Sequence, residues 1–122
     1  MAQTSSQVLQ IIDKFNSAFN RHDIEAVMSL MTDDCVFENT FPAPDGKRSE
    51  GQSAVRVVFV EFFNSSPQAV FEFEDIFGCD DRATVRWLYR WEGASGEGHV
   101  RGVDVFRIRD GKISEKLSYV KG

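Results

Sequence analysis

The second half of the chain consists of segments in which apolar and polar residues alternate, and this pattern constrains the fold most. The segments cover residues 70–77, 82–91, 99–109 and 112–120. Short stretches rich in Gly and Asp separate them, at residues 78–81, 93–98 and 110–111. Alternation predicts strands with one buried face, and short turns predict antiparallel neighbours. We therefore expect a meander of four long strands.

The first half predicts helices and one earlier strand. Residues 4–21 carry apolar side chains at helical spacing, and Asp23 is placed to cap a second, short helix. Residues 35–41 alternate as a strand, and residues 42–50 form a polar loop. Residues 51–64 return to helical spacing, although their β-branched and aromatic content also fits a strand. Helices followed by strands predict an α+β fold, one curved antiparallel sheet wrapped around helices on one face, in a single domain spanning residues 1–122.

The amino-acid composition limits the kinds of molecule that the protein is expected to bind. The chain contains 11 Phe, against two Trp and two Tyr, which suits an apolar core or a pocket for a small apolar ligand. A net charge of -5 argues against nucleic acid, and no long apolar stretch predicts a membrane span. The start of the chain has no secretory pattern, so we expect a cytoplasmic protein with Cys35 and Cys79 reduced. No metal-ligand spacing is present, and we expect neither metal nor cofactor.

Asp104 is the strongest candidate for chemistry. Strand alternation places it in the same row as Phe106 and Ile108. A carboxyl group on a buried apolar face is costly unless it is paired, hydrogen-bonded or used in catalysis. Asn39 is likewise the polar member of the row formed with Phe37 and Phe41.

Other residues admit both a functional and a structural interpretation. Trp87, Tyr89 and Trp91 share a strand face and either stack a planar ligand or form ordinary core. Asp75 fits a second pocket acid or a solvent-reaching strand residue, with the latter favoured. His99 is a weaker catalytic candidate near a Gly-rich loop.

Three stretches carry a resemblance to a known family. They are residues 19–38 (FNRHDIEAVMSLMTDDCVFE), Gly51 with residues 54–56 (AVR), and residues 102–118 (GVDVFRIRDGKISEKLS). In order and spacing they resemble the nuclear transport factor 2-like fold, in the branch with ketosteroid isomerase and the SnoaL-like polyketide cyclases. The resemblance implies a cone-shaped, cystatin-like roll of a curved sheet around three helices, with a cup that many chemistries share.

The resemblance also assigns roles to residues. Asp104 matches the protonated aspartate of ketosteroid isomerase, whereas Asn39 stands at the base and Phe15 at the tyrosine. Two of the three catalytic groups are missing, which argues against that mechanism. SnoaL-like cyclases imply a simpler scheme, in which Asp104 removes a proton from an activated carbon while Asn39 or Tyr89 holds the substrate oxygen. The expected ligand-binding residues are Phe15, Phe19, Asn39, Phe59, Trp87, Tyr89, Trp91 and Lys116.

The residue that faces Asp104 depends on the Asp110-Gly111 turn. A two-residue turn pairs Asp104 with Leu117, and a three-residue loop with a bulge at Gly111 pairs it with Lys116. Amphipathicity favours the first, because it gathers Ile113, Leu117 and Tyr119 on the core face. The resemblance favours the second, in which Lys116 and Ser118 face the cup, and we adopt it. An Asp104–Lys116 pair that only braces the sheet remains the structural alternative.

Three functions fit these features. The first is an isomerase, cyclase or dehydratase that moves a proton next to a carbonyl, and it is the one that we favour. The second is a binding protein with the same cup and no turnover. The third is a dimerising partner domain. In the adopted register an apolar outer-face cluster is suited to a homodimer partner, and it consists of Val103, Val105, Leu117 and Tyr119.

Overall fold

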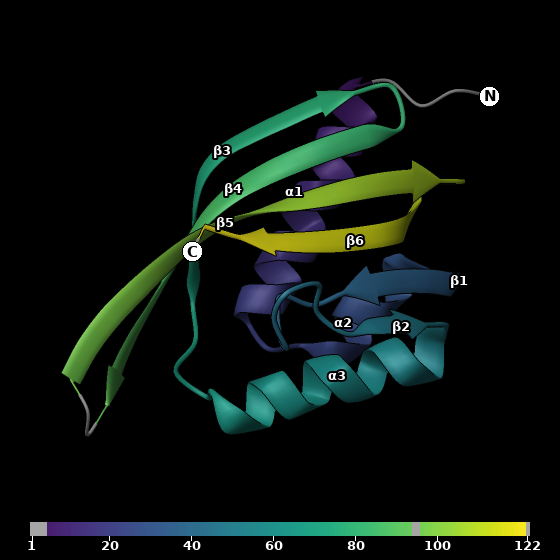
Figure 1. Cartoon of the computed structure of the whole chain (residues 1–122). Helices are drawn as coiled ribbons and strands as arrows, with labels where there is room; N and C mark the ends of the chain where they lie inside the picture. The colour runs from purple at the N-terminus through teal and green to yellow at the C-terminus, as the bar shows by residue number, and fades with distance from the viewer. Residues whose placement is uncertain (1–4, 94–95, 122) are drawn as a thin grey trace.

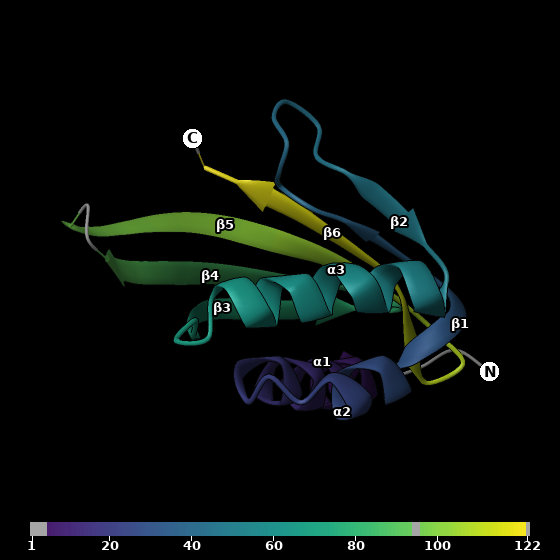
Figure 2. The same cartoon turned by 90° about the horizontal axis from the view of Figure 1, so that it is seen from below.

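Three helices lie on one face of a six-stranded curved sheet (Figures 1 and 2). The computed structural model describes residues 5–93 and 96–121. The elements in chain order are α1 (Ser5–Asn20), α2 (Ile24–Ser29), β1 (Met31–Glu38), β2 (Arg48–Glu50), α3 (Gln52–Ser65), β3 (Phe71–Cys79), β4 (Arg82–Gly93), β5 (Gly96–Arg109) and β6 (Lys112–Val120). The α+β class and the curved sheet wrapped around helices agree with the prediction.

The strand order is β2-β1-β6-β5-β4-β3, and one pair departs from the predicted antiparallel arrangement. β1 and β6 run parallel, whereas every other neighbouring pair is antiparallel. The meander β3 to β6 returns the chain to β1, so the two halves of the sequence meet at this parallel pair (Figure 1). Alternation within a strand does not reveal such a distant neighbour.

The predicted helices are confirmed within a few residues. The Asp23 carboxylate accepts a hydrogen bond from the Ala26 N–H at 3.2 Å and caps α2, as expected. His22, at the end of α1, contacts the Ala69 carbonyl oxygen through Nε2 at 2.8 Å, which is a structural role. Residues 51–64, which also fitted a strand, form α3 almost entirely. Among the helices that the structure describes, none is long and apolar enough to cross a membrane.

The strand of the first half was predicted with the wrong bounds. β1 begins at Met31, four residues before the predicted start, and ends at Glu38. Asp33 and Asp34, which precede the predicted strand, are exposed residues of β1, whose pairing with β6 shifts between Met31 and Val36. Residues 48–50 of the predicted loop form the short strand β2. This strand pairs with β1 and lies at the edge of the sheet.

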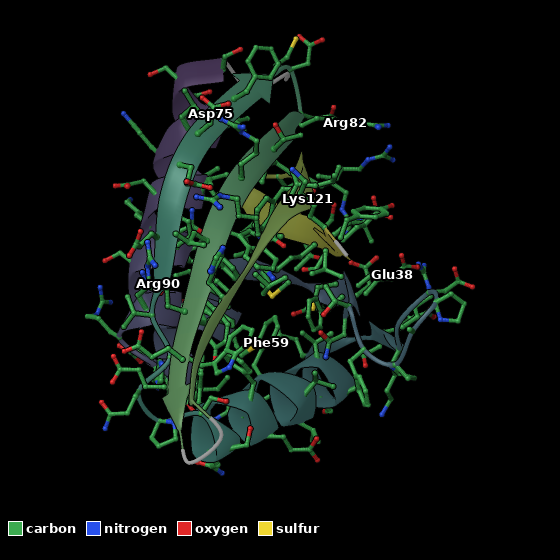
Figure 3. The ribbon with its side chains drawn as sticks, turned by 60° about the vertical axis from the view of Figure 1, so that its left-hand side comes forward. Glu38, Phe59, Asp75, Arg82, Arg90 and Lys121 are labelled. Atoms are coloured by element: carbon green, nitrogen blue, oxygen red, sulfur yellow. The ribbon has the colours of Figure 1, made fainter. Side chains whose placement is uncertain are left out.

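The core lies between the sheet and the helices α1 and α3. Phe15, Phe59 and Phe106 are almost fully buried there, and the ring of Phe15 lies 5.7 Å from that of Phe106 and 6.4 Å from that of Phe59. In Figure 3 the side chain of Phe59 points from α3 toward the sheet, while Arg90 lies on the outer side. These rings pack α1 against β5 and against α3.

The β5–β6 register differs from both alternatives derived from the sequence. Asp110 and Gly111 have φ values of 54° and 78° and form a two-residue turn, which pairs Arg109 with Lys112. Ser114 then has no partner across the ladder, and its hydroxyl donates to the Arg107 carbonyl oxygen at 3.2 Å.

This bulge shifts the rest of the strand. Asp104 pairs with Ser118, and Phe106 pairs with Lys116, so neither Leu117 nor Lys116 lies directly opposite Asp104. The extra residue, Ser114, lets both Ile113 and Lys116 face the interior. The prediction that Lys116 and Ser118 face the cup is therefore correct, but the bulge lies within β6 and not at Gly111.

Candidate active site

A cavity of about 280 Å³ lies between the sheet and the helices α1 and α3, and most of its walls are aromatic. It is lined by the residues that the sequence favoured for catalysis or ligand binding, which are Asp104, Phe15, Phe19, Asn39, Phe59, Trp87, Tyr89, Trp91 and Lys116. They come from α1, α3 and the strands β4, β5 and β6, except for Asn39, which directly follows β1. The volume lies just below the range of about 300–1,000 Å³ that is typical of drug-sized ligand pockets, which favours a compact ligand.

Aromatic rings form a continuous wall from the interior to the rim. Phe62, Phe71 and Tyr89 lie within 5.1 to 6.2 Å of one another, measured between ring centroids. Trp91 follows at 5.9 Å from Tyr89 and is 43% exposed, so it lies at the rim. This arrangement offers flat apolar surfaces to a ring-containing ligand.

The Asp104 carboxylate is buried and held by two donors on one oxygen. Its Oδ1 accepts hydrogen bonds from Trp87 Nε1 at 3.0 Å and from the Ser118 hydroxyl at 2.6 Å. An indole N–H can only donate, so Oδ1 serves as an acceptor. Trp87 and Ser118 come from the strands on either side of β5 and therefore fix the orientation of the carboxylate.

The second carboxylate oxygen faces Lys116. Asp104 Oδ2 lies 3.3 Å from Lys116 Nζ, and each side chain is only 9% exposed. Lys116 Nζ also donates to the Ser118 hydroxyl at 3.2 Å. Asp104 is thus paired with a basic side chain inside the cavity and is not an isolated acid.

Three phenylalanine rings surround the Lys116 ammonium group. Nζ lies 4.7 Å from the ring centroid of Phe37, 5.5 Å from that of Phe19 and 5.9 Å from that of Phe59. Aromatic faces attract a cation at such distances. The rings and the carboxylate together keep a positive charge inside an apolar cavity.

Gly102 makes the Trp87–Asp104 contact possible. It pairs with Trp87 across β4 and β5, and the indole lies over the space where a side chain would stand. A Cβ atom at Gly102 would lie 2.3 Å from Trp87 Cζ2 and 2.4 Å from the backbone oxygen of Tyr119. The absence of a side chain therefore allows the indole to reach Asp104.

The remaining candidates differ in position. The Asn39 carbonyl oxygen Oδ1 accepts from the Thr40 N–H at 2.8 Å, so it is already engaged with the backbone. Asp75 is exposed, and its carboxylate lies 4.0 Å from Arg86 Nε, which agrees with the solvent-reaching interpretation. His99 is also exposed, outside this cavity. Within residues 5–93 and 96–121 there is no group of three or more metal-ligating side chains.

Comparison with known proteins places the chain in a family. A sequence model of the SnoaL-like domain matches residues 12–116, which is most of the chain. The protein belongs to the SnoaL-like domain family. No match was found among curated proteins.

Solved structures extend this assignment to the nuclear transport factor 2-like superfamily. An NTF2-like protein of unknown function from Mesorhizobium loti is 42% identical, covers 97% of this chain and 93% of its own, and has a TM-score of 0.83. A candidate ketosteroid isomerase from Kribbella flavida is 16% identical over 97% of this chain and 80% of its own, with a TM-score of 0.81. A candidate polyketide cyclase from Xanthomonas campestris is 18% identical over 98% and 93%, with a TM-score of 0.76. The last two show the shared fold alone.

The cavity is also lined by residues that were not identified as candidates from the sequence. Phe37, Phe62 and Phe71 line it, as does Asn16, a residue that is 5% exposed. Asn16 follows Ile12 by four residues on the buried face of α1, so a lone polar residue in an apolar helical stripe was the available signal. The same reasoning that selected Asp104 on a strand applies to Asn16 on a helix.

Proposed function

We propose that this SnoaL-like protein is a small-molecule enzyme that moves a proton next to a carbonyl group of an apolar ligand, with Asp104 as the acid/base. The observation that carries the proposal is the buried Asp104–Lys116 pair, which lines an otherwise largely aromatic cavity. An ion pair in such surroundings costs desolvation energy, and cavities are where such groups are commonly used for chemistry.

Asp104 has the geometry of a positioned base. Trp87 and Ser118 hold Oδ1, whereas Oδ2 has one contact, with Lys116. Each carboxylate oxygen offers two acceptor sites, so Oδ2 retains one for a proton from the ligand. Holding the base by two hydrogen bonds keeps it aligned while the proton moves.

Lys116 supplies the complementary electrostatic group. An ammonium group has three donors, and two of them serve Asp104 and Ser118. The third can donate to the ligand's carbonyl oxygen and stabilise the negative charge that develops there as the adjacent carbon loses its proton. This assigns to Lys116 the role of holding the oxygen that the sequence suggested for Asn39 or Tyr89.

The proton balance follows from these two groups. Asp104 takes the proton from the carbon next to the carbonyl, and the electron pair moves onto the oxygen held by Lys116. Return of the proton at another carbon gives isomerisation. Attack of the enolate on a second carbonyl gives cyclisation, in which Asp104 returns its proton to the alkoxide oxygen formed from that carbonyl. Phe15 carries no hydroxyl, so the substrate's own neighbouring carbonyls must supply part of the activation.

Proton exchange in deuterated water tests the role of Asp104. Wild-type protein should catalyse exchange of the α-protons of 1-tetralone, followed by NMR, and Asp104→Asn should reduce the rate at least about a hundredfold, the low end of general-base contributions. Asp75→Asn, which alters an exposed carboxylate on β3, is the matched control and should leave the rate unchanged. Equal rates in wild type and Asp104→Asn would remove Asp104 from the mechanism.

One observation favours the alternative of a binding protein without turnover. Both Asp104 oxygens already have partners within the protein, and the tyrosine and base of ketosteroid isomerase are absent. This alternative predicts that cyclic ketones quench the fluorescence of Trp87 while α-proton exchange stays at the rate of buffer.

A further inference from the structure

Three polar side chains of the cavity wall lie outside the hydrogen-bond network of Asp104. They belong to Asn39 and Thr40, which follow β1, and to Tyr89 on β4. Within residues 5–93 and 96–121, no partner binds the Asn39 amide nitrogen or the hydroxyl groups of Thr40 and Tyr89. The protein does not enclose these three atoms, whereas it encloses the unpartnered amide nitrogen of Asn16. They are therefore open to water or to a ligand.

Asn39 continues a row of polar residues that crosses the sheet. In the parallel pair of β1 and β6, Glu38 lies opposite Leu117, so the next residue, Asn39, follows at the level of Ser118. Ser118 in turn pairs with Asp104 on β5. Neighbouring strands are about 4.8 Å apart, which puts the backbone of Asn39 about 10 Å from that of Asp104. Because both side chains line the same cavity, a compact ligand can contact both.

The orientation of the Asn39 amide group is fixed by the backbone. The Asn39 N–H donates to the Lys47 carbonyl oxygen at 2.9 Å, and the Asn39 side-chain oxygen Oδ1 accepts from the Thr40 N–H at 2.8 Å. A backbone N–H requires an acceptor, so the amide oxygen faces Thr40 and Nδ2 takes the other position. Nδ2 is thus a donor that is held in place before a ligand arrives, which reduces the entropy lost on binding.

The Thr40 side chain adds a second polar group next to this donor. A hydroxyl group both donates and accepts a hydrogen bond, whereas the Asn39 Nδ2 only donates. A ligand hydroxyl can therefore accept from Asn39 and donate to Thr40, and a ligand carbonyl can accept from both. Neither side chain is charged, so the two together suit an uncharged oxygen better than a carboxylate, which is bound most strongly by charged donors.

The Tyr89 hydroxyl lies in a different part of the cavity. Tyr89 pairs with Val100, four residues before Asp104 along β5, and its ring lies next to that of Trp91 at the exposed rim. The strands β5 and β6 separate it from β1. Its ring is part of the aromatic wall, and water at the rim can meet its hydroxyl group. Tyr89 is therefore a second place for a polar contact, which an experiment must distinguish from Asn39.

We propose that Asn39 and Thr40 form a subsite for a second oxygen of the ligand, to which Asn39 Nδ2 donates a hydrogen bond. The inference rests on the proposed function, since it places the first oxygen, the ketone, at Lys116. The ligand class that follows is a compact cyclic ketone with an uncharged hydroxyl or carbonyl oxygen on its ring system. A ketone without this oxygen leaves the Asn39 donor to water and binds less tightly.

A matched series of probes tests this proposal. Binding of 1-tetralone and of its 5-, 6- and 7-hydroxy derivatives is followed by NMR through the indole N–H signal of Trp87, which lines the cavity. At least one hydroxy derivative should bind wild type about threefold to tenfold more tightly than 1-tetralone, the value of one net hydrogen bond. Asn39→Leu, which replaces the amide with an apolar group of similar size, should reduce this ratio to about one.

Two further variants locate the contact. Thr40→Val keeps the shape of the side chain without its hydroxyl and should lower the ratio without abolishing it, because the ligand still accepts from Asn39. Tyr89→Phe keeps the ring and removes only the hydroxyl, so the ratio should stay as in wild type. A preference that is lost in Tyr89→Phe and kept in Asn39→Leu would overturn the proposal and assign the second oxygen to Tyr89.

The folded state of the variants is checked in the same NMR spectra. Asn39→Ala repeats the measurement if Leu does not fit at this position. Loss of the folded spectrum in both Asn39 variants would overturn the proposal, because the amide then serves to hold the loop of residues 39–47 through its bond with Thr40.

The remaining outcomes separate this inference from the proposed function. Hydroxy derivatives that gain nothing over 1-tetralone in wild type overturn the subsite and mean that only water meets Asn39 and Thr40. Loss of the preference in Asn39→Leu without any α-proton exchange by wild type supports the subsite and contradicts the proposed catalysis. Failure of every tetralone to bind at millimolar concentration overturns the proposed ligand class.

Discussion

Replacement of Lys116 with Met should destabilise the protein by about 3 kcal/mol, at the low end of the range of about 3–5 kcal/mol for removing one member of a buried ion pair. The side chains of Lys116 and Asp104 are 9% exposed and line a cavity that water can enter, which favours the low end. Asp104 keeps its hydrogen bonds from Trp87 and Ser118, so the carboxylate is left only partly compensated. For a chain of this size the thermal midpoint should fall by about 10–15 °C.

Unfolding in urea, followed by tryptophan fluorescence, measures this loss of unfolding free energy. The slope of the free energy against urea concentration should be the same in the variant and the wild type. Lys112→Met, at the exposed start of the same strand, is the control and should stay within about 0.5 kcal/mol of wild type. The double variant Asp104→Asn with Lys116→Met removes both charges while the Asn carbonyl still accepts from Trp87. It should recover at least half of the loss, because no uncompensated charge stays buried.

The reasoning fails if Lys116→Met costs less than about 1 kcal/mol, the usual value of an exposed pair. It also fails if the effects of the two substitutions simply add, because additivity means that the two charges do not interact.

Two further predictions concern the surface and the cysteines. We propose that the outer-face cluster mediates a homodimer. Sedimentation of the wild type should give twice the chain mass of 13.8 kDa, and Leu117→Lys should give the mass of the monomer. A monomeric wild type would contradict the dimer. Burial raises the pKa of the Cys35 thiol, so less of the reactive thiolate is present at a given pH. At pH 8 a disulfide reagent should modify the exposed Cys79 rapidly and Cys35 only after unfolding; equal rates would show that Cys35 is accessible.

Local patterns in the sequence were sufficient for the three helices, for the four strands of the second half and for the choice of Asp104. Helical spacing predicted α1, the cap at Asp23 predicted α2, and alternation placed Asp104 on the inner face with Phe106. These features depend on residues that are only a few positions apart. At that separation, the spacing along a helix or strand determines the face on which each side chain lies. The cavity-lining positions of the candidate residues follow from the same directions together with the family resemblance.

The sequence was insufficient where two distant segments set the geometry. The bulge at Ser114 decides which residue faces Asp104, and Ser is compatible with a regular strand position as well as with a bulge. The parallel pairing of β1 with β6 depends on how the whole meander returns to the first strand. Similarly, the Trp87–Asp104 hydrogen bond requires Gly102 to lie opposite the indole, which only the register of two strands determines.

A crystal structure with an enolisable cyclic ketone, such as 5-hydroxy-1-tetralone, bound to the protein tests the central claim most directly. The account predicts that the ketone oxygen lies within about 3.2 Å of Lys116 Nζ and that the adjacent carbon faces Asp104 Oδ2. The first contact is required for charge stabilisation and the second for proton transfer. A ketone that binds in the cavity with its oxygen pointing away from Lys116, and its adjacent carbon out of reach of Asp104, would contradict the proposed chemistry.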